Sequence, residues 1–221
     1  MSNFLSEASD CVIFDLDGTL IDSIGDITDC VNILRRQRGA AECSAEIVRA
    51  AVGNGARVLC EKIMPDILRP DESTEDLFLE FRGIYIEVAS DHSRDIHWLP
   101  GSLGLLDHLR DMNVPRAILT NKPRSVTEAL MPRLDQHGPW AAVVCPEDAG
   151  APKPDPSGLI SILEKLNCVV EKTLLVGDSA VDFMTGINAG VRTVGRRGGY
   201  GTATPPEPDL WVDDLTQLIP R

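Results

Sequence analysis

The chain of 221 residues is 43% hydrophobic, so it can bury a substantial core and is expected to fold as one large globular domain or two modest ones. A net charge of −13 argues against broad binding to nucleic acids or anionic membranes, because both usually require a basic surface. The sequence has no stretch of roughly 18 apolar residues, and its start lacks the charged and apolar regions of a secretory signal. We therefore expect a cytoplasmic protein whose partners include neither nucleic acid nor membrane.

The first predicted element is a buried strand over the apolar residues 11–14, which Asp15 and Asp17 follow directly. A short apolar run of this kind is typical of a strand covered on both faces of a parallel sheet, and ligands collect beyond the carboxyl ends of such strands. The two carboxylates therefore lie where chemistry is expected. A helix cap at one aspartate and a turn at the other would also explain an isolated Asp-x-Asp.

Residues 23–91 show helical periodicity and no convincing strand. An apolar stripe from Ile24 to Leu34 predicts a helix that ends near Gly39, and further helices are predicted over 44–51, up to about Met64, and from 73 to about 88. Because this segment follows the carboxylate pair at once, we interpret it as an all-helical cap over the site.

From residue 97 onward, helices and strands alternate. Helices are predicted over 100–112, 125–134, 157–166 and 181–189, and strands over 116–119, 141–145, 174–176, 192–194 and 211–212. This alternation indicates an α/β fold, with a Rossmann-like parallel sheet and helices on both faces.

Polar side chains stand at the ends of these strands or just beyond them. They are Asp15, Asp17, Thr120, Asn121, Lys153, Asp178 and Asp182. The ends of parallel strands lie on one edge, so these groups should converge. Several carboxylates cannot gather in a partly buried site without a counter-charge. Since no His or Cys joins the group, Mg²⁺ is the expected cation.

Such a site favours phosphoryl chemistry. One aspartate can attack as a nucleophile and form an acyl phosphate. A second aspartate, two residues on, can protonate the leaving oxygen and later deprotonate water. The ammonium of Lys153 and the hydroxyl of Thr120 can stabilise the charge of the transferred group.

Four motifs in this order resemble those of the haloacid dehalogenase superfamily of phosphatases. They are Asp15-Leu16-Asp17-Gly18-Thr19-Leu20, Thr120-Asn121-Lys122, Lys153-Pro154-Asp155-Pro156, and Gly177-Asp178-Ser179 with Asp182. The resemblance implies that Asp15 is the nucleophile and a metal ligand. It implies that Asp17 is the general acid and base, and gives the metal its backbone carbonyl. Thr120 and a backbone N–H of Asn121 would bind phosphate, and Lys153 would neutralise phosphate and nucleophile.

For the metal, the resemblance implies Asp178 as a ligand and Asp182 as a weaker or indirect one, with a solvated helical carboxylate as the alternative for Asp182. Within the superfamily, Asp22-Ser23, Asp26-Ile27 and the turn of residues 52–55 resemble the phosphoglycolate phosphatases.

The cap turn is a candidate for substrate binding. Gly53 would let the backbone approach a ligand, Asn54 tolerates left-handed geometry, and Arg57 could bind a substrate carboxylate with its planar fork. A plain helix-to-helix turn and an exposed arginine are the alternatives. Lys122 and Arg124 are further candidates for the carboxylate. We interpret residues 196–201 as a mobile basic loop near the last strand, which is plain surface or at most a flap.

Together these features predict an α/β core of residues 1–22 and 92–221, with a helical cap of residues 23–91. The predicted function is Mg²⁺-dependent hydrolysis of a small phosphorylated metabolite, 2-phosphoglycolate by resemblance, through an aspartyl-phosphate. A phosphosugar mutase of the same superfamily and a non-catalytic protein that binds a phosphorylated ligand are the alternatives. The expected assembly is a monomer or homodimer.

Overall fold

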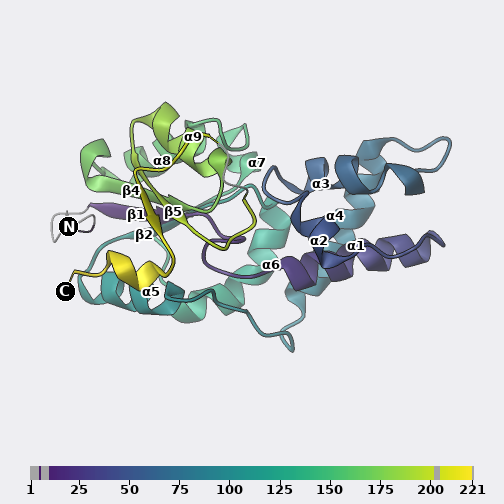
Figure 1. Ribbon diagram of the computed structural model, residues 1–221, viewed down its shortest axis with the longest axis horizontal. Helices are drawn as coiled ribbons and strands as arrows, with labels where there is room; N and C mark the ends of the chain where they lie inside the picture. The colour runs from purple at the N-terminus through teal and green to yellow at the C-terminus, as the bar shows by residue number, and fades with distance from the viewer. Residues whose placement is uncertain (1–4, 6–9, 202–204, 221) are drawn as a thin grey trace.

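A computed structural model describes residue 5, residues 10–201 and residues 205–220. Within these residues, six strands form one parallel sheet in the order β3-β2-β1-β4-β5-β6 (Figure 1). The strands are β1 (Cys11–Phe14), β2 (Arg116–Leu119), β3 (Ala142–Val144), β4 (Thr173–Gly177), β5 (Arg192–Arg196) and β6 (Leu210–Val212).

Strand β1 lies in the middle of the sheet, and all four of its residues are buried. Ile13 stands opposite Ala117 of β2 and Leu175 of β4. A strand that is hydrogen-bonded on both sides and covered on both faces has no solvent-facing positions, which explains why its sequence is apolar throughout.

Helices cover both faces of the sheet, as the alternating pattern predicts. Val12 and Phe14 pack on one face with α5 (Ser102–Asp111), α6 (Arg124–Leu134) and the short helix η4 (Leu215–Leu218). Cys11 and Ile13 point to the opposite face, where α8 (Ser157–Leu166) lies. Helix α9 (Ala180–Ala189) contacts β4 and β5. The remaining short helices of this part are η2 (Asp135–His137), α7 (Pro146–Ala149) and η3 (Val170–Lys172).

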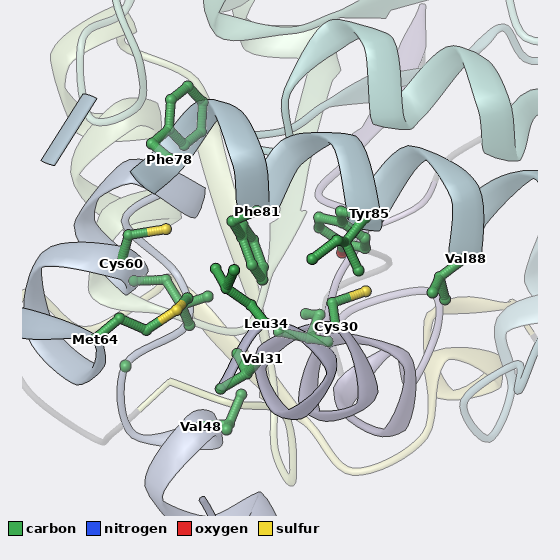
Figure 2. Close-up of a cluster of buried hydrophobic side chains, with 14 of the residues drawn as sticks. Cys30, Val31, Leu34, Val48, Cys60, Met64, Phe78, Phe81, Tyr85 and Val88 are labelled. Carbon is green, nitrogen blue, oxygen red and sulfur yellow. The ribbon is translucent and has the colours of Figure 1, made fainter. Parts of the chain in front are cut away.

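The helices of residues 23–91 form a separate group beside the sheet, on the right in Figure 1. They are α1 (Ile24–Gln37), α2 (Ala45–Arg49), α3 (Ala56–Ile63), η1 (Pro65–Ile67) and α4 (Thr74–Ser90). Their apolar sides meet in a cluster around Leu34, Met64 and Phe81 (Figure 2), which Val126 of α6 and Tyr200 also join. A capping box begins α4, since Ser73 and Asp76 bond reciprocally.

The predicted fold class, a parallel sheet with helices on both faces and an inserted group of helices, is therefore confirmed. Division into two domains at residues 22/23 and 91/92 stays a prediction. None of the helices in the described ranges is long and apolar enough to cross a bilayer. The cytoplasmic location also stays a prediction.

This topology decides where the functional groups lie. Strands β1, β2 and β4 are neighbours that run in the same direction, so Asp15, Thr120 and Asp178 follow them at one edge of the sheet. Helix α4 packs against α6 and holds the helical group beside this edge.

Candidate active site

Asp15 follows the central strand directly and is fixed there by a backbone hydrogen bond and by burial. Its backbone N–H donates to the carbonyl of Val176 at 2.9 Å, which continues the pairing of β1 with β4, and the residue is 7% exposed. The chain then turns sharply at Gly18, whose φ of +88° favours glycine. A Cβ at this position would also lie 2.5 Å from Oδ2 of Asp178. Glycine at position 18 therefore permits both the turn and the close approach of the Asp178 carboxylate.

Three buried carboxylates converge beside this turn. Oxygens of Asp15, Asp178 and Asp182 all lie within 4.8 Å of one another. Burial raises the pKa of Asp15 to about 8, with the neighbouring carboxylates adding to the rise. Burial also raises the pKa of Asp178 to about 6, helped by the charge of Asp182. In this cluster, therefore, negative charge is concentrated and poorly solvated.

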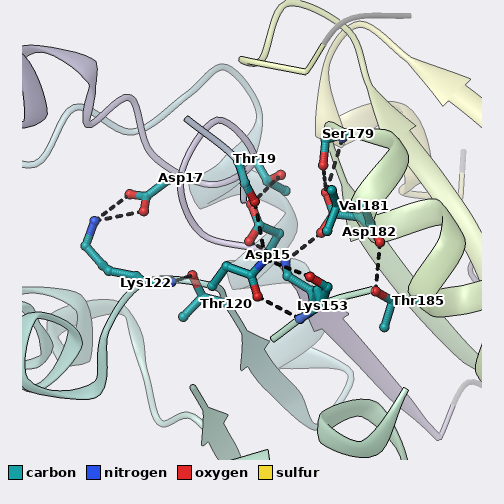
Figure 3. Close-up of polar contacts among 12 residues, drawn as sticks. Asp15, Asp17, Thr19, Thr120, Lys122, Lys153, Ser179, Val181, Asp182 and Thr185 are labelled. Atoms are coloured by element: carbon teal, nitrogen blue, oxygen red, sulfur yellow. Dashed lines mark hydrogen bonds and ion pairs between the residues drawn. The ribbon is translucent and has the colours of Figure 1, made fainter. Parts of the chain in front are cut away.

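Lys153 lies among these carboxylates (Figure 3). Its Nζ donates to Oδ1 of Asp15 and to Oδ1 of Asp182, both at 2.6 Å. Burial disfavours the ammonium, but the charges of the two aspartates outweigh it and raise the pKa of Lys153. One fixed positive charge thus faces three carboxylates.

The side chain of Asn121 holds the backbone of Lys153 in place. Its Oδ1 accepts from the Lys153 N–H at 2.8 Å, and its Nδ2 donates to the Lys153 carbonyl at 3.1 Å and to the Gly53 carbonyl at 3.3 Å. Asn121 thereby joins the loop after β2, the lysine loop and the cap turn. Whether its backbone N–H binds phosphate stays a prediction.

Asp182 is a buried part of the site, and a solvated carboxylate on the helix surface is excluded. It is 1% exposed, and its Oδ2 accepts from Ser179 Oγ at 2.7 Å and from the N–H groups of Ser179 and Asp178 at 3.2 and 3.3 Å. These bonds cap the start of α9. Its Oδ1 accepts from Lys153, so both carboxylate oxygens of Asp182 are held by hydrogen bonds.

The side chain of Asp17 does not join the three other aspartates. It is bound by Lys122, whose Nζ donates to Oδ1 and Oδ2 at 2.9 and 2.8 Å (Figure 3). Ser23 Oγ donates to the same carboxylate at 2.6 Å. Lys122 also donates to the hydroxyl of Tyr85 on α4. The role of Lys122 in holding Asp17 was not expected from the sequence.

A single pocket brings these groups together with the helical cap. Its empty space is about 610 Å³, and its lining includes Asp15, Asp17, Thr120, Asn121, Lys122, Lys153, Asp178 and Asp182 from the sheet edge. The cap contributes Ile27, Val52, Gly53, Gly55, Ala56, Leu59, Phe81 and Tyr85. The result is a site with one strongly polar end and one mainly apolar wall.

Two of the predicted cap residues lie outside this lining. Asn54 is exposed. The side chain of Arg57 is 51% exposed, pairs with Glu75 and lies over the ring of Phe78, 4.6 Å from its centroid. This geometry gives no support to ligand contact by Asn54 or to carboxylate binding by Arg57. Gly53, in contrast, lies at the pocket wall.

The loop of residues 196–201 is not plain surface, and that expectation is wrong. The N–H groups of Tyr200 and Gly201 donate to Oδ2 of Asp178. The Tyr200 hydroxyl donates to Oδ1 of Asp22 at 2.6 Å and accepts from the N–H of Ser23 at 2.6 Å. The loop therefore orients one carboxylate of the site and ties it to the start of the cap.

The donor set fits a hard divalent cation. When ionised, the three carboxylates and the ammonium carry a net charge of −2, and the Thr19 hydroxyl stands 3.4 Å from Asp15 and 3.5 Å from Asp178. Carboxylate and hydroxyl oxygens without His or Cys are the donors that Mg²⁺ prefers. A cation of this kind would also relieve the repulsion that raises the pKa of Asp15 and Asp178.

Comparison with known sequences gives consistent matches. The family model for haloacid dehalogenase-like hydrolases matches residues 12–196. Phosphoglycolate phosphatase 1 of Pseudomonas aeruginosa is 30% identical over 212 residues, which cover 95% of this chain and 78% of the relative. The phosphoglycolate phosphatase of Pseudomonas syringae pv. tomato is 32% identical over 223 residues, covering 98% and 81%.

Solved structures show the same architecture. The crystal structure of a predicted phosphoglycolate phosphatase from Haemophilus somnus superposes with a TM-score of 0.83 at 25% identity, covering 96% of each chain. CbbY from Rhodobacter sphaeroides, in complex with phosphate, superposes with a TM-score of 0.79 at 17% identity, covering 95% of this chain and 96% of that one. The second likeness concerns the fold alone.

Proposed function

The chain belongs to the haloacid dehalogenase-like hydrolases and is a phosphatase of that family, and we propose that it hydrolyses a small phosphomonoester through an aspartyl-phosphate on Asp15. The observation that carries the proposal is the convergence of Asp15, Lys153 and two further buried carboxylates at the carboxyl edge of the sheet. Such a site concentrates charge where a phosphoryl group would be transferred.

In the first step, an oxygen of Asp15 attacks the phosphorus and the bond to the leaving oxygen breaks. Lys153 stands against Asp15 and can balance the charge of the incoming phosphoryl oxygens. The hydroxyl of Thr120 lines the same pocket and can donate to one of those oxygens. These groups are held before substrate arrives, so little reorganisation is needed.

Asp17 is the proposed general acid and base. It lies two residues beyond the nucleophile and lines the pocket, with its side chain 14% exposed. As an acid it would protonate the leaving oxygen, and as a base it would take a proton from the water that hydrolyses the acyl phosphate.

Asp15 and Asp178 would hold Mg²⁺ together with the Asp17 carbonyl. Asp182 would be a weaker or indirect ligand. When bound, Mg²⁺ supplies positive charge to the phosphoryl oxygens. Lys153 occupies one oxygen of Asp15 and the free oxygen of Asp182, so it keeps both side chains oriented toward the same point.

The proposed substrate is 2-phosphoglycolate or a similarly small phosphorylated acid. Relatives at 30–32% identity over nearly the whole chain carry the name phosphoglycolate phosphatase. The cap wall, formed in part by Leu59, Phe81 and Tyr85, limits the space beyond the polar end. Closure of such a wall over a ligand excludes water and selects for size.

The test is a panel of phosphomonoesters assayed with and without Mg²⁺, for the native enzyme and for Asp15→Asn and Asp17→Asn. We expect Mg²⁺-dependent release of phosphate, a loss of about 10²- to 10⁴-fold in kcat for Asp17→Asn, and a loss at least as large for Asp15→Asn, which lacks the nucleophile. Asp111→Asn, whose side chain is 73% exposed, serves as the matched control. Unchanged turnover in both active-site variants would contradict the proposal, and transfer of phosphate to a second sugar hydroxyl would indicate a mutase.

A further inference from the structure

A substrate that carries a carboxylate needs a positive group inside the pocket, and few are present. Among the described residues that line the pocket, the cationic side chains are Lys122 and Lys153. Lys153 is engaged by Asp15 and Asp182 at the phosphoryl end. Lys122 is therefore the cation that faces the rest of the ligand.

Other cations near the cap are held elsewhere. Arg57 pairs with Glu75 at the surface. Arg49 lies over the ring of Tyr200, 4.8 Å from its centroid. Arg124 pairs with Asp148 and donates to the Val143 carbonyl. None of these three arginines belongs to the pocket lining among the described residues.

Lys122 is built into the same loop as the proposed phosphate-binding hydroxyl. Its backbone N–H donates to Oγ1 of Thr120 at 3.1 Å, so the loop fixes the ammonium relative to the phosphoryl end. The side chain is 2% exposed. A buried ammonium requires an anionic partner, and in the free enzyme Asp17 is that partner.

The donors of Lys122 are fully used without substrate. An ammonium has three N–H donors, and those of Lys122 go to the two oxygens of Asp17 and to the Tyr85 hydroxyl. Burial raises the pKa of Tyr85 well above its usual value, so its hydroxyl stays neutral and supplies no counter-charge. A ligand carboxylate can reach Lys122 only by displacing one of these partners, and Asp17 is the anionic one.

We propose that Lys122 recognises the substrate carboxylate and exchanges Asp17 for it. The released Asp17 carboxylate then takes up a proton from water and turns to the leaving oxygen as the general acid. This inference rests on the proposed function. A phosphomonoester without a carboxylate leaves Asp17 paired with Lys122 and Ser23. Lys122 therefore selects substrates in two ways, since a ligand carboxylate gains an ion pair and also frees the acid needed for turnover.

The experiment compares kcat/KM for 2-phosphoglycolate with kcat/KM for ethyl phosphate, which lacks the carboxylate. We expect the native enzyme to prefer 2-phosphoglycolate, and Lys122→Met to reduce that preference by about 10- to 100-fold, as for loss of a charged hydrogen bond. For 2-phosphoglycolate, Lys122→Met should lower kcat and raise KM. Lys122→Arg should recover part of both changes. Arg124→Met, which removes a cation at the start of α6 that lies outside the pocket lining, is the control and should keep the native preference.

A preference that survives in Lys122→Met would overturn the inference while leaving the proposed phosphatase intact. A native enzyme that does not prefer the carboxylate-bearing substrate would overturn the inference together with the proposed substrate. A native enzyme that hydrolyses no phosphomonoester of the panel would contradict the proposed function itself, and one that hydrolyses others but neither of these two would overturn the inference and the proposed substrate.

A second measurement does not depend on the folding of a Lys122 variant. Calorimetry without Mg²⁺, a condition in which the esters are bound and not hydrolysed, measures the exchange. In Asp17→Asn, Lys122 loses its competing anion, so 2-phosphoglycolate should bind more tightly than to the native protein, and the binding of ethyl phosphate should be unchanged. Equal changes for both ligands would contradict the exchange of Asp17 for the substrate carboxylate.

Discussion

Replacement of Lys153 by methionine removes an ammonium that is bonded to two members of the carboxylate cluster. Each of its two contacts is 2.6 Å long, and its side chain is 3% exposed. At an effective dielectric constant of about 20, one pair of unit charges about 4 Å apart contributes about 4 kcal/mol, and part of this is offset by the cost of burying the ions. Removal of one partner from a buried ion pair typically destabilises a protein by about 3–5 kcal/mol.

For a chain of this length, that loss corresponds to a fall of about 6–20 °C in Tm. Thermal unfolding followed by circular dichroism in the absence of Mg²⁺ measures it, with the exposed Lys165→Met as the control. Addition of Mg²⁺ should raise the Tm of Lys153→Met more than that of the native protein, because a divalent cation then neutralises the cluster. Equal Tm values for the two lysine variants, with no extra effect of Mg²⁺, would refute this electrostatic reasoning.

Further predictions concern the carboxylates and the loop that supports them. The pKa of Asp15 is raised to about 8 and that of Asp178 to about 6. The folded metal-free protein therefore binds protons more tightly at these two groups than the unfolded chain does. Its free energy of unfolding should fall as pH rises from about 4 to 8. Mg²⁺ must displace these protons, so its affinity measured by calorimetry should rise over pH 6 to 8, and a flat profile would argue against the cluster. Gly199→Ala should weaken Mg²⁺ binding, because the new Cβ would lie 2.3 Å from Oδ2 of Asp178, whereas Gly83→Ala meets no atom within 4 Å and should bind Mg²⁺ normally. Tyr200→Phe should lower the free energy of unfolding by about 1–3 kcal/mol, since it leaves buried partners unsatisfied; chemical denaturation measures this, and native stability would show that the hydroxyl contributes nothing.

Much of the site follows from local sequence and one topological rule. The apolar run 11–14 predicted a buried strand of a parallel sheet, and parallel strands deliver Asp15, Thr120 and Asp178 to the same edge. The same rule does not give the direction of a side chain after its strand ends. Asp17 was expected to converge with the other polar side chains, but its carboxylate turns to Lys122.

The contacts that the sequence did not reveal are those between distant loops. The hydroxyl of Tyr200 donates to Asp22, which lies 178 positions earlier in the chain. The periodicity of apolar residues does not predict a polar contact between such distant segments. A signal was present in the glycines around Tyr200, because a Cβ at Gly199 or Gly201 would collide with the side chain or backbone of Asp178. Glycines with this role cannot be told from those of a flexible loop until the neighbouring strand is placed.

The orientation of Arg57 was unpredictable for a different reason. Position 57 lies one turn into α3, and the periodicity of a short helix does not tell which neighbour its polar side will face. In the fold, α3 packs beside α4, and Glu75 at the start of α4 takes the guanidinium. The packing of α3 against α4 therefore determines which partner Arg57 binds.

The most direct test of the account is to trap the covalent intermediate on Asp15. Asp17→Asn should slow hydrolysis of the acyl phosphate, so acid quenching shortly after mixing with substrate and Mg²⁺, followed by peptide mass spectrometry, should show one added phosphoryl group on the peptide that contains Asp15. The same treatment of Asp15→Asn should show none. A phosphoryl group on another residue, or steady turnover by an enzyme that never carries one, would contradict the central claim.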